Sequence, residues 1–465
     1  MNLFQLVLKQ MRQRALSTWL TLLSVMLGVA LAIALIVFSR EGGKLFGQTE
    51  YGYDLVIGAK GSRLQLVLNT VYHLDEPTGT IRWDVYESLF DRARYGRFVA
   101  WAVPVAATDS YENFPVIATL PSLFGYDLDG QTRLPDGRRF EYRVGRELAF
   151  AEGRPFHARK FEAVIGSEVA QRTGLKPGDT FQVIHGRDAE RGHEHEEDWT
   201  LVGILEPTRT AFDSAVFVPL AGSIALGEHT AGLKQRAELV EQGLSPAELE
   251  ETWPDVIAAG GEKREGYVFD PATGLIYPTL PQRFWGASGI FVNTGGLGFA
   301  SETLRFQVNN RPDAMAASPA TEMRTFFQNF LEGPTQLLLL VTILVTVVAA
   351  VSILVSIYNS VSARRREIAI LRSLGATRGR VLALICIEAG VIGLAGALLG
   401  WIAGHALAAG ASELLRRRLG EGMNWLSVGG WELAYLAGVV ILAVLAGLVP
   451  ALKAYKTPVA QNLSE

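Results

Sequence analysis

Four apolar stretches, each long enough to cross a membrane, constrain the fold of this 465-residue chain more than any other feature. Residues 15–39, 336–358 and 433–452 contain no charged side chain, and residues 381–409 carry only Glu388 and His405. A helix of about 20 residues crosses the hydrocarbon core of a bilayer. The sequence therefore predicts one membrane-spanning helix near the N-terminus, a large intervening region, and three further spans close together.

Basic residues in the short flanking segments predict the orientation. Lys9, Arg12 and Arg14 precede the first stretch, and Lys453 and Lys456 follow the last. Short cytoplasmic segments are enriched in lysine and arginine, whereas long translocated domains are largely insensitive to their own charge. We therefore expect both termini in the cytoplasm and the large region outside it. The first stretch lacks a small-residue cleavage site and is too long for a signal peptide, which indicates an uncleaved anchor.

Composition and cysteine content narrow the function. Hydrophobic residues make up 49% of the chain and charged residues 19%, which suits a protein that is partly membrane-embedded and partly soluble. The net charge of −4 provides no basic field for nucleic acid. The single cysteine, Cys386, lies in the third predicted span, so the external region has no disulfide. The phosphate-binding pattern G-x-x-x-x-G-K-[ST] is absent, so we expect no nucleotide hydrolysis by this chain itself.

The intervening region has the patterns of a mixed α/β domain. Residues 181–184, 199–205 and 215–218 read as strands, and residues 164–166 lead into a short helix over 167–173. Residues 222–260 change to helical composition, with a capping box in which Ser245 precedes Glu248. Near the end of the region, one apolar helix face runs towards the second span and predicts a helical stalk; it consists of Met323, Phe326, Phe327, Phe330 and Leu331.

The segment 364–380, between the second and third spans, carries six arginines and one glutamate. Ile368, Ile370, Leu371 and Leu374 form an apolar face at helical spacing, Gly375 is a helix stop, and Thr377 can cap the next helix. On spacing alone, a basic linker beside the membrane is the simpler interpretation. The alternative is an amphipathic helix on which a cytosolic partner acts.

The third span contains further candidate residues. Glu388 is expensive in lipid unless it faces another helix, so it predicts either a polar contact that transmits movement or a buried structural hydrogen bond. Gly393, Gly396, Gly400 and Gly404 place small residues on one helix face. Such a face permits close helix approach, either within one subunit or at a dimer contact.

Histidines and carboxylates gather at residues 193–198, with His185 upstream. Both residue types bind zinc, but the spacing is poor for a single site, and no H-E-x-x-H pattern occurs. We interpret the cluster as a solvated hairpin loop between strands and predict no metal site.

Several segments together resemble the MacB and FtsX-like permeases of ABC transporters. These are QMRQRALSTWL (10–20), VIGSEVA (164–170), GLKPGD (174–179), LVGIL (201–205), VFVPL (216–220) and, most specifically, REIAILRSLGA (366–376). Residues 54–62 (DLVIGAKGS) resemble a sub-group marker. The resemblance implies an α+β membrane protein whose four transmembrane helices, one and then three, carry a large extracytoplasmic α/β domain of MacB periplasmic-core type on a helical stalk.

The resemblance also implies a permease of the mechanotransmission class that is not itself an enzyme. Two copies of the permease would assemble with two copies of a separate ABC-type ATPase, which binds ATP and Mg. The permease would lie in the bacterial inner membrane, in contact with membrane lipid. A periplasmic or outer-membrane partner would join them. The exported substrate would be a peptide, lipid, lipoprotein or drug-like molecule; the alternative is a non-transporting regulator that activates a periplasmic or cell-wall enzyme. The coupling helix that contacts the ATPase would comprise Arg364, Arg365, Arg366, Glu367, Ile368, Leu371, Arg372, Leu374 and Gly375.

These expectations give one map of the chain. It has a cytoplasmic amphipathic segment (1–14), the first span (15–39), the stalk and core domain (40–335, with the helical insertion at about 222–260), the second span (336–358), the coupling loop (359–380), the third span (381–409), a short external loop (410–431), the fourth span (432–452) and a cytoplasmic tail (453–465).

Overall fold

A computed structural model describes residues 3–46, 51–74, 76–185, 195–226, 231–296, 298–326, 328–329, 333–373, 376–419 and 423–456. Its contacts divide the chain into two compact units. The helical unit comprises residues 1–46, 327–417 and 422–465, and the α/β domain comprises residues 47–326 and 418–421. Each unit is described below by itself.

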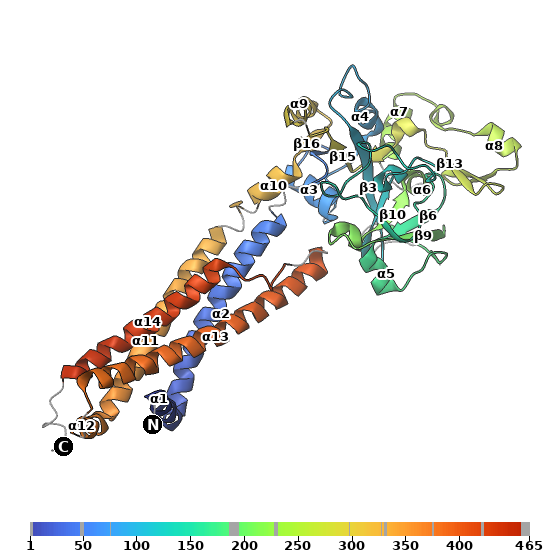
Figure 1. Ribbon diagram of the computed structural model, residues 1–465. Coiled ribbons are helices and arrows are strands. Elements are labelled where there is room, and N and C mark those ends of the chain that lie inside the picture. The colour runs from blue at the N-terminus through green and yellow to red at the C-terminus, as the bar shows by residue number, and fades with distance from the viewer. Residues whose placement is uncertain are drawn as a thin grey trace. The chain divides into compact units, whose positions relative to one another are not determined.

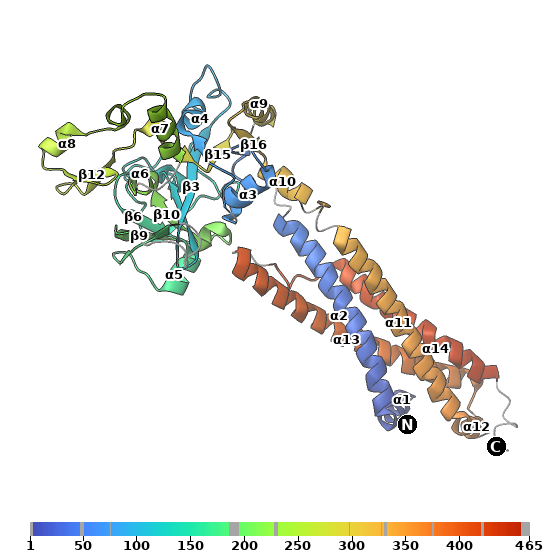
Figure 2. The ribbon, with the colours of Figure 1, turned by 180° about the vertical axis from the view of Figure 1, so that it is seen from behind.

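The helical unit is built from long apolar helices that run side by side (Figures 1 and 2). Its helices are α1 (Leu3–Gln13), α2 (Ala15–Phe46), α11 (Gly333–Ala363), α12 (Arg365–Ser373), α13 (Arg378–Leu419) and α14 (Gly430–Lys456). Within the described part of the chain, four helical stretches are long and apolar enough to cross a membrane: Ala15–Gly42, Gln336–Ala363, Arg378–Arg416 and Gly430–Lys453. Each of the four apolar stretches found in the sequence lies in one of them.

Close approach between α13 and α2 depends on three glycines. A Cβ added at Gly396, Gly400 or Gly404 would lie less than 3 Å from side-chain atoms of α2, those of Val25, Val29 and Ile33 respectively. Small residues at every fourth position allow two helix backbones to come this close. The structure therefore uses this face for packing within one chain. Gly393 does not share the face, because its hydrogens point at Ala443 of α14.

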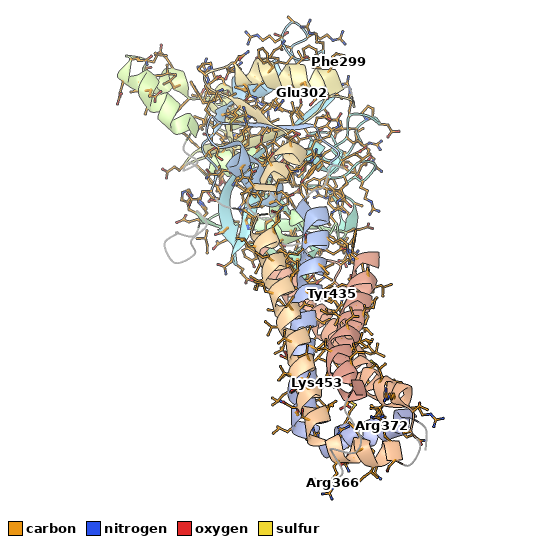
Figure 3. All side chains as sticks on the ribbon, turned by 90° about the vertical axis from the view of Figure 1, so that its left-hand side faces the viewer. Phe299, Glu302, Arg366, Arg372, Tyr435 and Lys453 are labelled. Atoms are coloured by element: carbon orange, nitrogen blue, oxygen red, sulfur yellow. The ribbon has the colours of Figure 1, made fainter. Side chains whose placement is uncertain are left out.

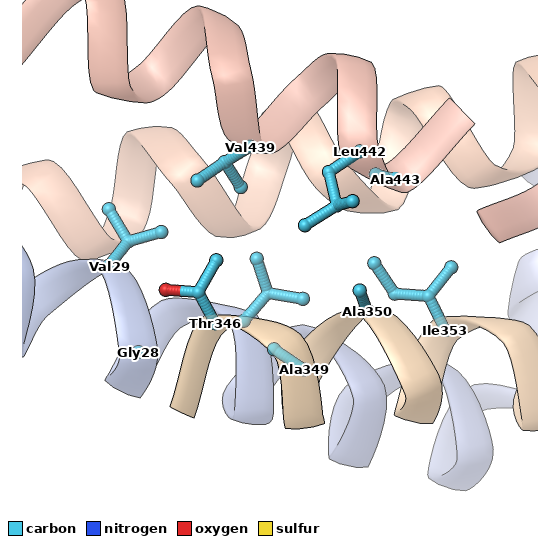
Figure 4. A pocket seen from close by; sticks show the side chains of 10 residues that line it. Gly28, Val29, Thr346, Ala349, Ala350, Ile353, Val439, Leu442 and Ala443 are labelled. Atoms are coloured by element: carbon cyan, nitrogen blue, oxygen red, sulfur yellow. The ribbon is translucent and has the colours of Figure 1, made fainter. Parts of the chain in front are cut away.

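A small apolar cavity lies between α2, α11 and α14 (Figure 4). Its volume of about 10 Å³ is close to the space that one water molecule needs. The one hydroxyl in its wall, that of Thr346, is engaged by the Thr342 carbonyl and the Tyr435 hydroxyl. We interpret this cavity as a packing gap, since it is too small for a substrate.

The α/β domain is organised around an 11-stranded mixed sheet. Its main order is β16-β1-β15-β3-β4-β10-β6-β9-β5, with β7 added to β9 and β8 added to β3. The strands are β1 (Leu55–Gly58), β3 (Trp101–Tyr111), β4 (Phe114–Thr119), β5 (Phe150–Gly153), β6 (Glu162–Ile165), β7 (Thr180–Phe181), β8 (Ile184–His185), β9 (Trp199–Leu205), β10 (Val216–Pro219), β15 (Gly289–Asn293) and β16 (Met315–Ala317). The β4–β10 and β6–β9 pairs are parallel, and the other pairs are antiparallel.

Short helices and two small sheets surround this sheet. The helices are α3 (Arg63–Tyr72), α4 (Trp83–Ser88), α5 (Ser167–Thr173), α6 (Leu220–Ala225), α7 (Ala231–Glu241), α8 (Pro254–Ala258), α9 (Gly298–Asn309) and α10 (Pro319–Phe326). Short 3-10 turns lie at Pro121–Phe124, Ala211–Ser214, Pro246–Leu249 and Gln282–Phe284. The small sheets pair β2 (Ile81–Arg82) with β14 (Gly286–Ala287), and β11 (Glu262–Arg264) with β12 (Tyr267–Asp270) and β13 (Leu275–Pro278).

The sequence patterns agree with much of this domain and fail in identifiable places. The strand at 199–205, the helix at 167–173 and the Ser245 capping box are all present. The expected strand at 181–184 is split between β7 and β8. The expected helical insertion is largely helix and 3-10 turn up to Ala258, after which β11–β13 form a sheet that the pattern did not indicate.

The apolar face expected to form the stalk is described only in part. Met323 of α10 is fully buried, and Phe326 ends that helix. Phe327, Phe330 and Leu331 lie outside the described residues, so the stalk stays a prediction.

The glycine packing gives a direct stability test. Gly400→Ala would place a methyl group 2.6 Å from Val29 Cβ and 2.7 Å from the Met26 carbonyl oxygen, so we expect a loss of about 1–3 kcal/mol from overpacking. Gly410→Ala, on the same helix, meets nothing within 4 Å and should be neutral or stabilising by up to about 1 kcal/mol. Thermal unfolding of the detergent-solubilised protein measures both, and equal behaviour of the two variants would contradict the packing role of Gly400.

Candidate functional site

Arg364 lies at the break between α11 and α12 and is turned into the helical unit. Its side chain is within 3.5 Å of Glu388 Oε1 on α13, and the two residues are only 9% and 7% exposed. Contact of Arg364 with a partner protein stays a prediction; within this chain its guanidinium is buried against the carboxylate of Glu388. Glu388 has the ion-pairing partner that an acidic residue in an apolar helix requires.

Helix α12 packs one face against the other helices of the helical unit, and its opposite face is exposed. Ala369 is buried, and Ile368 packs half-buried against the apolar core of the unit. Ile370 is 44% exposed, and the neighbouring side chains of Arg366 and Glu367 are exposed as well. Of the predicted apolar face, Ile368 therefore packs inward and Ile370 is exposed, while the side chains of Leu371 and Leu374 lie outside the described residues.

The basic end of the helical unit is visible in Figure 3, where Arg366 and Arg372 are labelled on α12. Arg378 and Arg380, at the start of α13, are exposed as well. The Thr377 hydroxyl accepts a hydrogen bond from the Arg380 N–H at 3.3 Å, as its predicted capping role requires. Of the remaining coupling-helix residues, the side chains of Arg365 and Leu371 and all of Leu374 and Gly375 lie outside the described set.

A second polar cluster joins α2, α13 and α14 around the carboxylate of Glu432, which is 0% exposed. This carboxylate accepts hydrogen bonds from Arg40 Nη1 at 2.9 Å, from His405 Nε2 at 2.9 Å and from Trp401 Nε1 at 3.2 Å. The Gly429 N–H donates a fourth bond at 3.0 Å. Hydrogen bonds to a charged group stabilise by about 1.5–3 kcal/mol each, so the cluster fixes three helices relative to one another.

The same cluster extends to the segment that precedes α14. Arg40 also reaches the hydroxyl of Ser427 at 2.8 Å and its carbonyl oxygen, and Arg40 Nε is 2.9 Å from Glu41 Oε1. His405 is itself buried in this network. Glu432 was not among the candidate residues from the sequence. The feature that could have identified it is its position as a lone carboxylate at the edge of the apolar stretch 433–452.

The segment that resembles a sub-group marker has a structural role in the α/β domain. Asp54 Oδ2 accepts bonds from the backbone N–H and the hydroxyl of Thr294, both at 2.6 Å. Ser62 caps α3 through the Gln65 N–H at 3.3 Å. The segment therefore locks β1 and α3 into the domain.

The expected solvated loop at residues 193–198 is only partly found. Glu196 and Asp198 are exposed, but His195 is buried, which contradicts that expectation for this residue. His193 and Glu194 lie outside the described residues. The structure brings His195 to His185 and to Asp109, a residue far away in the sequence.

Comparisons with known proteins agree with this architecture. The profile of the MacB-like periplasmic core domain matches residues 18–249, and that of the FtsX-like permease C-terminal matches residues 339–459. The chain is 27% identical over 292 residues to YknZ, an uncharacterized ABC transporter permease of Bacillus subtilis. This match spans 57% of this chain and 70% of YknZ. It is 36% identical over 118 residues to an uncharacterized ABC transporter permease of Methanocaldococcus jannaschii, a match that spans 23% of this chain and 28% of the relative.

The Arg364–Glu388 pair makes a quantitative prediction. Glu388→Ala leaves a buried guanidinium without its carboxylate, so we expect a loss of about 3–5 kcal/mol, and the double variant Arg364→Met, Glu388→Leu should recover much of it. The exposed pair of Arg416 and Glu413 on the same helix is the control, since its removal should cost about 0–1 kcal/mol. A double-mutant cycle of unfolding in detergent measures the coupling, and additive effects at Arg364 and Glu388 would contradict it.

Proposed function

Because this chain belongs to the FtsX/MacB-like family of ABC transporter permeases, we propose that it converts ATP hydrolysis by a separate ATPase into movement of its α/β domain. That movement exports or extrudes a substrate such as a peptide, lipid, lipoprotein or drug-like molecule. The ATPase subunit binds the ATP and Mg, and two permeases join two ATPases. The helical unit lies in the bacterial inner membrane with both chain termini in the cytoplasm.

The observation that carries this proposal is the position of α12 between two long apolar helices. The exposed face with Arg366, Glu367 and Ile370 offers an apolar anchor surrounded by charge, which is the chemistry of a helix that seats in a groove of another protein. The opposite face rests on the helical unit through Ile368 and Ala369. A push on the exposed face is therefore applied directly to the membrane helices.

The buried ion pair supplies the next link. Arg364 joins the α11–α12 break to α13 through Glu388, so movement of α12 pulls on two long helices at once. Further along α13, the Glu432 cluster joins α13 to α2 and α14. Helix α2 leads in sequence into the α/β domain, and α11 follows that domain. The polar clusters thus make the helices move as coupled bodies rather than singly.

We expect α12 to be the element that the ATPase engages. Ile370→Asp should weaken ATPase association roughly 30-fold, because one buried anchor contributes about 2 kcal/mol. Ile257→Asp, on α8 of the α/β domain, is the matched control, since its isoleucine is exposed to 42% against 44% for Ile370. Co-purification and ATPase stimulation by the full-length permease are the measurements. If Ile370→Asp binds and stimulates the ATPase like the parent, α12 is only a basic linker.

The orientation is tested by cysteine labelling in intact cells. In a Cys386→Ser parent, a cysteine at the exposed position Asp179 should react with an impermeant thiol reagent, and one at the exposed position Ser373 should react only after the cells are opened. The reverse pattern would overturn the proposed topology.

A further inference from the structure

The α/β domain brings together three side chains of metal-binding chemistry that the transport proposal does not use. One ligand atom from each of Asp109, His185 and His195 lies within 4.8 Å of the other two. We propose that these residues form a binding site for a divalent transition-metal ion such as Zn²⁺. This proposal is independent of the proposed transport function.

The backbone fixes all three side chains. Asp109 of β3 and His185 of β8 are directly paired residues of an antiparallel ladder, so their side chains stand on the same face of the sheet. A β-bulge between Ala107 and Asp109 changes the register of β3 at this point, and bulges commonly re-aim a side chain towards a site. The His195 N–H donates to the Val183 carbonyl oxygen at 3.0 Å, which holds His195 beside β8.

The separations suit ligands around one ion. Asp109 Oδ1 is 3.5 Å from His185 Nδ1 and 3.7 Å from His195 Nε2, and both distances exceed those of ordinary hydrogen bonds. Ligand atoms about 2.0–2.1 Å from a tetrahedral zinc ion lie roughly 3.3–3.4 Å from one another. Each aspartate–histidine separation is a few tenths of an ångström longer than this spacing, and the two histidine ligand atoms, which lie within 4.8 Å of each other, would also move closer together around the ion.

Burial and donor chemistry support the same site. Asp109 is 2% exposed and His195 is also buried, whereas the His185 side chain is about one-third exposed. A divalent ion would place a positive charge beside this buried carboxylate. Two imidazoles and one carboxylate are a donor set typical of zinc, and three protein ligands leave a fourth position for water or another exchangeable ligand. The partial exposure of His185 gives an ion a route of entry.

Sequence spacing alone argued against this site for a physical reason. The residues between His185 and His195 include another histidine, His193, and several acidic residues, and nothing in the sequence marks which of these side chains converge. The third ligand comes from β3, and only the β3–β8 pairing brings it into place. The ion would join β3 to the two segments that carry His185 and His195.

The test uses the full-length protein in detergent, purified without a polyhistidine tag and stripped with a chelator. We expect Zn²⁺ titration by calorimetry to show one ion per chain, and Co²⁺ to give the absorption bands of a tetrahedral nitrogen and oxygen site. Asp109→Asn, His195→Gln and His185→Ala should each weaken binding at least tenfold.

The control is His157→Ala, which should bind like the parent. His157 Nε2 lies 3.3 Å from Asp129 Oδ1, so it forms another histidine–aspartate pair, but it is not part of the three-residue cluster. Added Zn²⁺ should also raise the melting temperature of the parent and of His157→Ala, but not that of Asp109→Asn. If a variant at a buried position fails to fold, the Co²⁺ spectrum of the parent and the titration of the His185→Ala variant, at the partly exposed position, still test the site. Absence of saturable binding by the parent, or unchanged binding by His185→Ala, would overturn the proposal.

Discussion

Charges buried among apolar helices must be paired, and this requirement organises the helical unit. An isolated charge taken out of water costs several kcal/mol, so each buried ionic group specifies the position of its partner. Arg364 and Glu388 join the start of α12 to α13, and Glu432 collects donors from α2 and α13. Few helix arrangements satisfy both sets of contacts, so the polar groups define the arrangement that apolar packing alone would leave less specific.

Apolar packing completes this arrangement at short range. Gly396, Gly400 and Gly404 let α13 lie against α2 with no room for a side chain between them. Packed helices in contact of this kind shift as bodies rather than bend independently. The helical unit therefore combines a tight helix pair with ionic links at separate points along α13. These are the properties that the proposed transmission of movement from α12 requires.

The α/β domain follows a different physical rule. Its stability comes from a sheet whose strands are mostly buried, as in the fully buried β6 and β10, and from a separate small sheet over β11–β13. The described part contains no disulfide, since the single cysteine lies in α13. A metal ion held by Asp109, His185 and His195 would join β3 to segments that follow β7, which is a link that apolar burial does not provide.

The sequence by itself determined the membrane character, the mixed α/β domain and the family. The apolar stretches are visible because a span needs an uninterrupted run of apolar residues, and the motif at 366–376 is local. The strand at 199–205 and the Ser245 capping box were also predictable from the sequence, because the alternation of apolar residues along a strand and the capping of a helix both depend on neighbouring residues. Tertiary structure alone decided which partners meet across long separations. It turned Arg364 inward to Glu388, packed Ile368 against the helical core while leaving Ile370 exposed, and brought Asp109 to two histidines. These contacts depend on how helices and strands pack, and neither periodicity nor spacing along the chain encodes that packing.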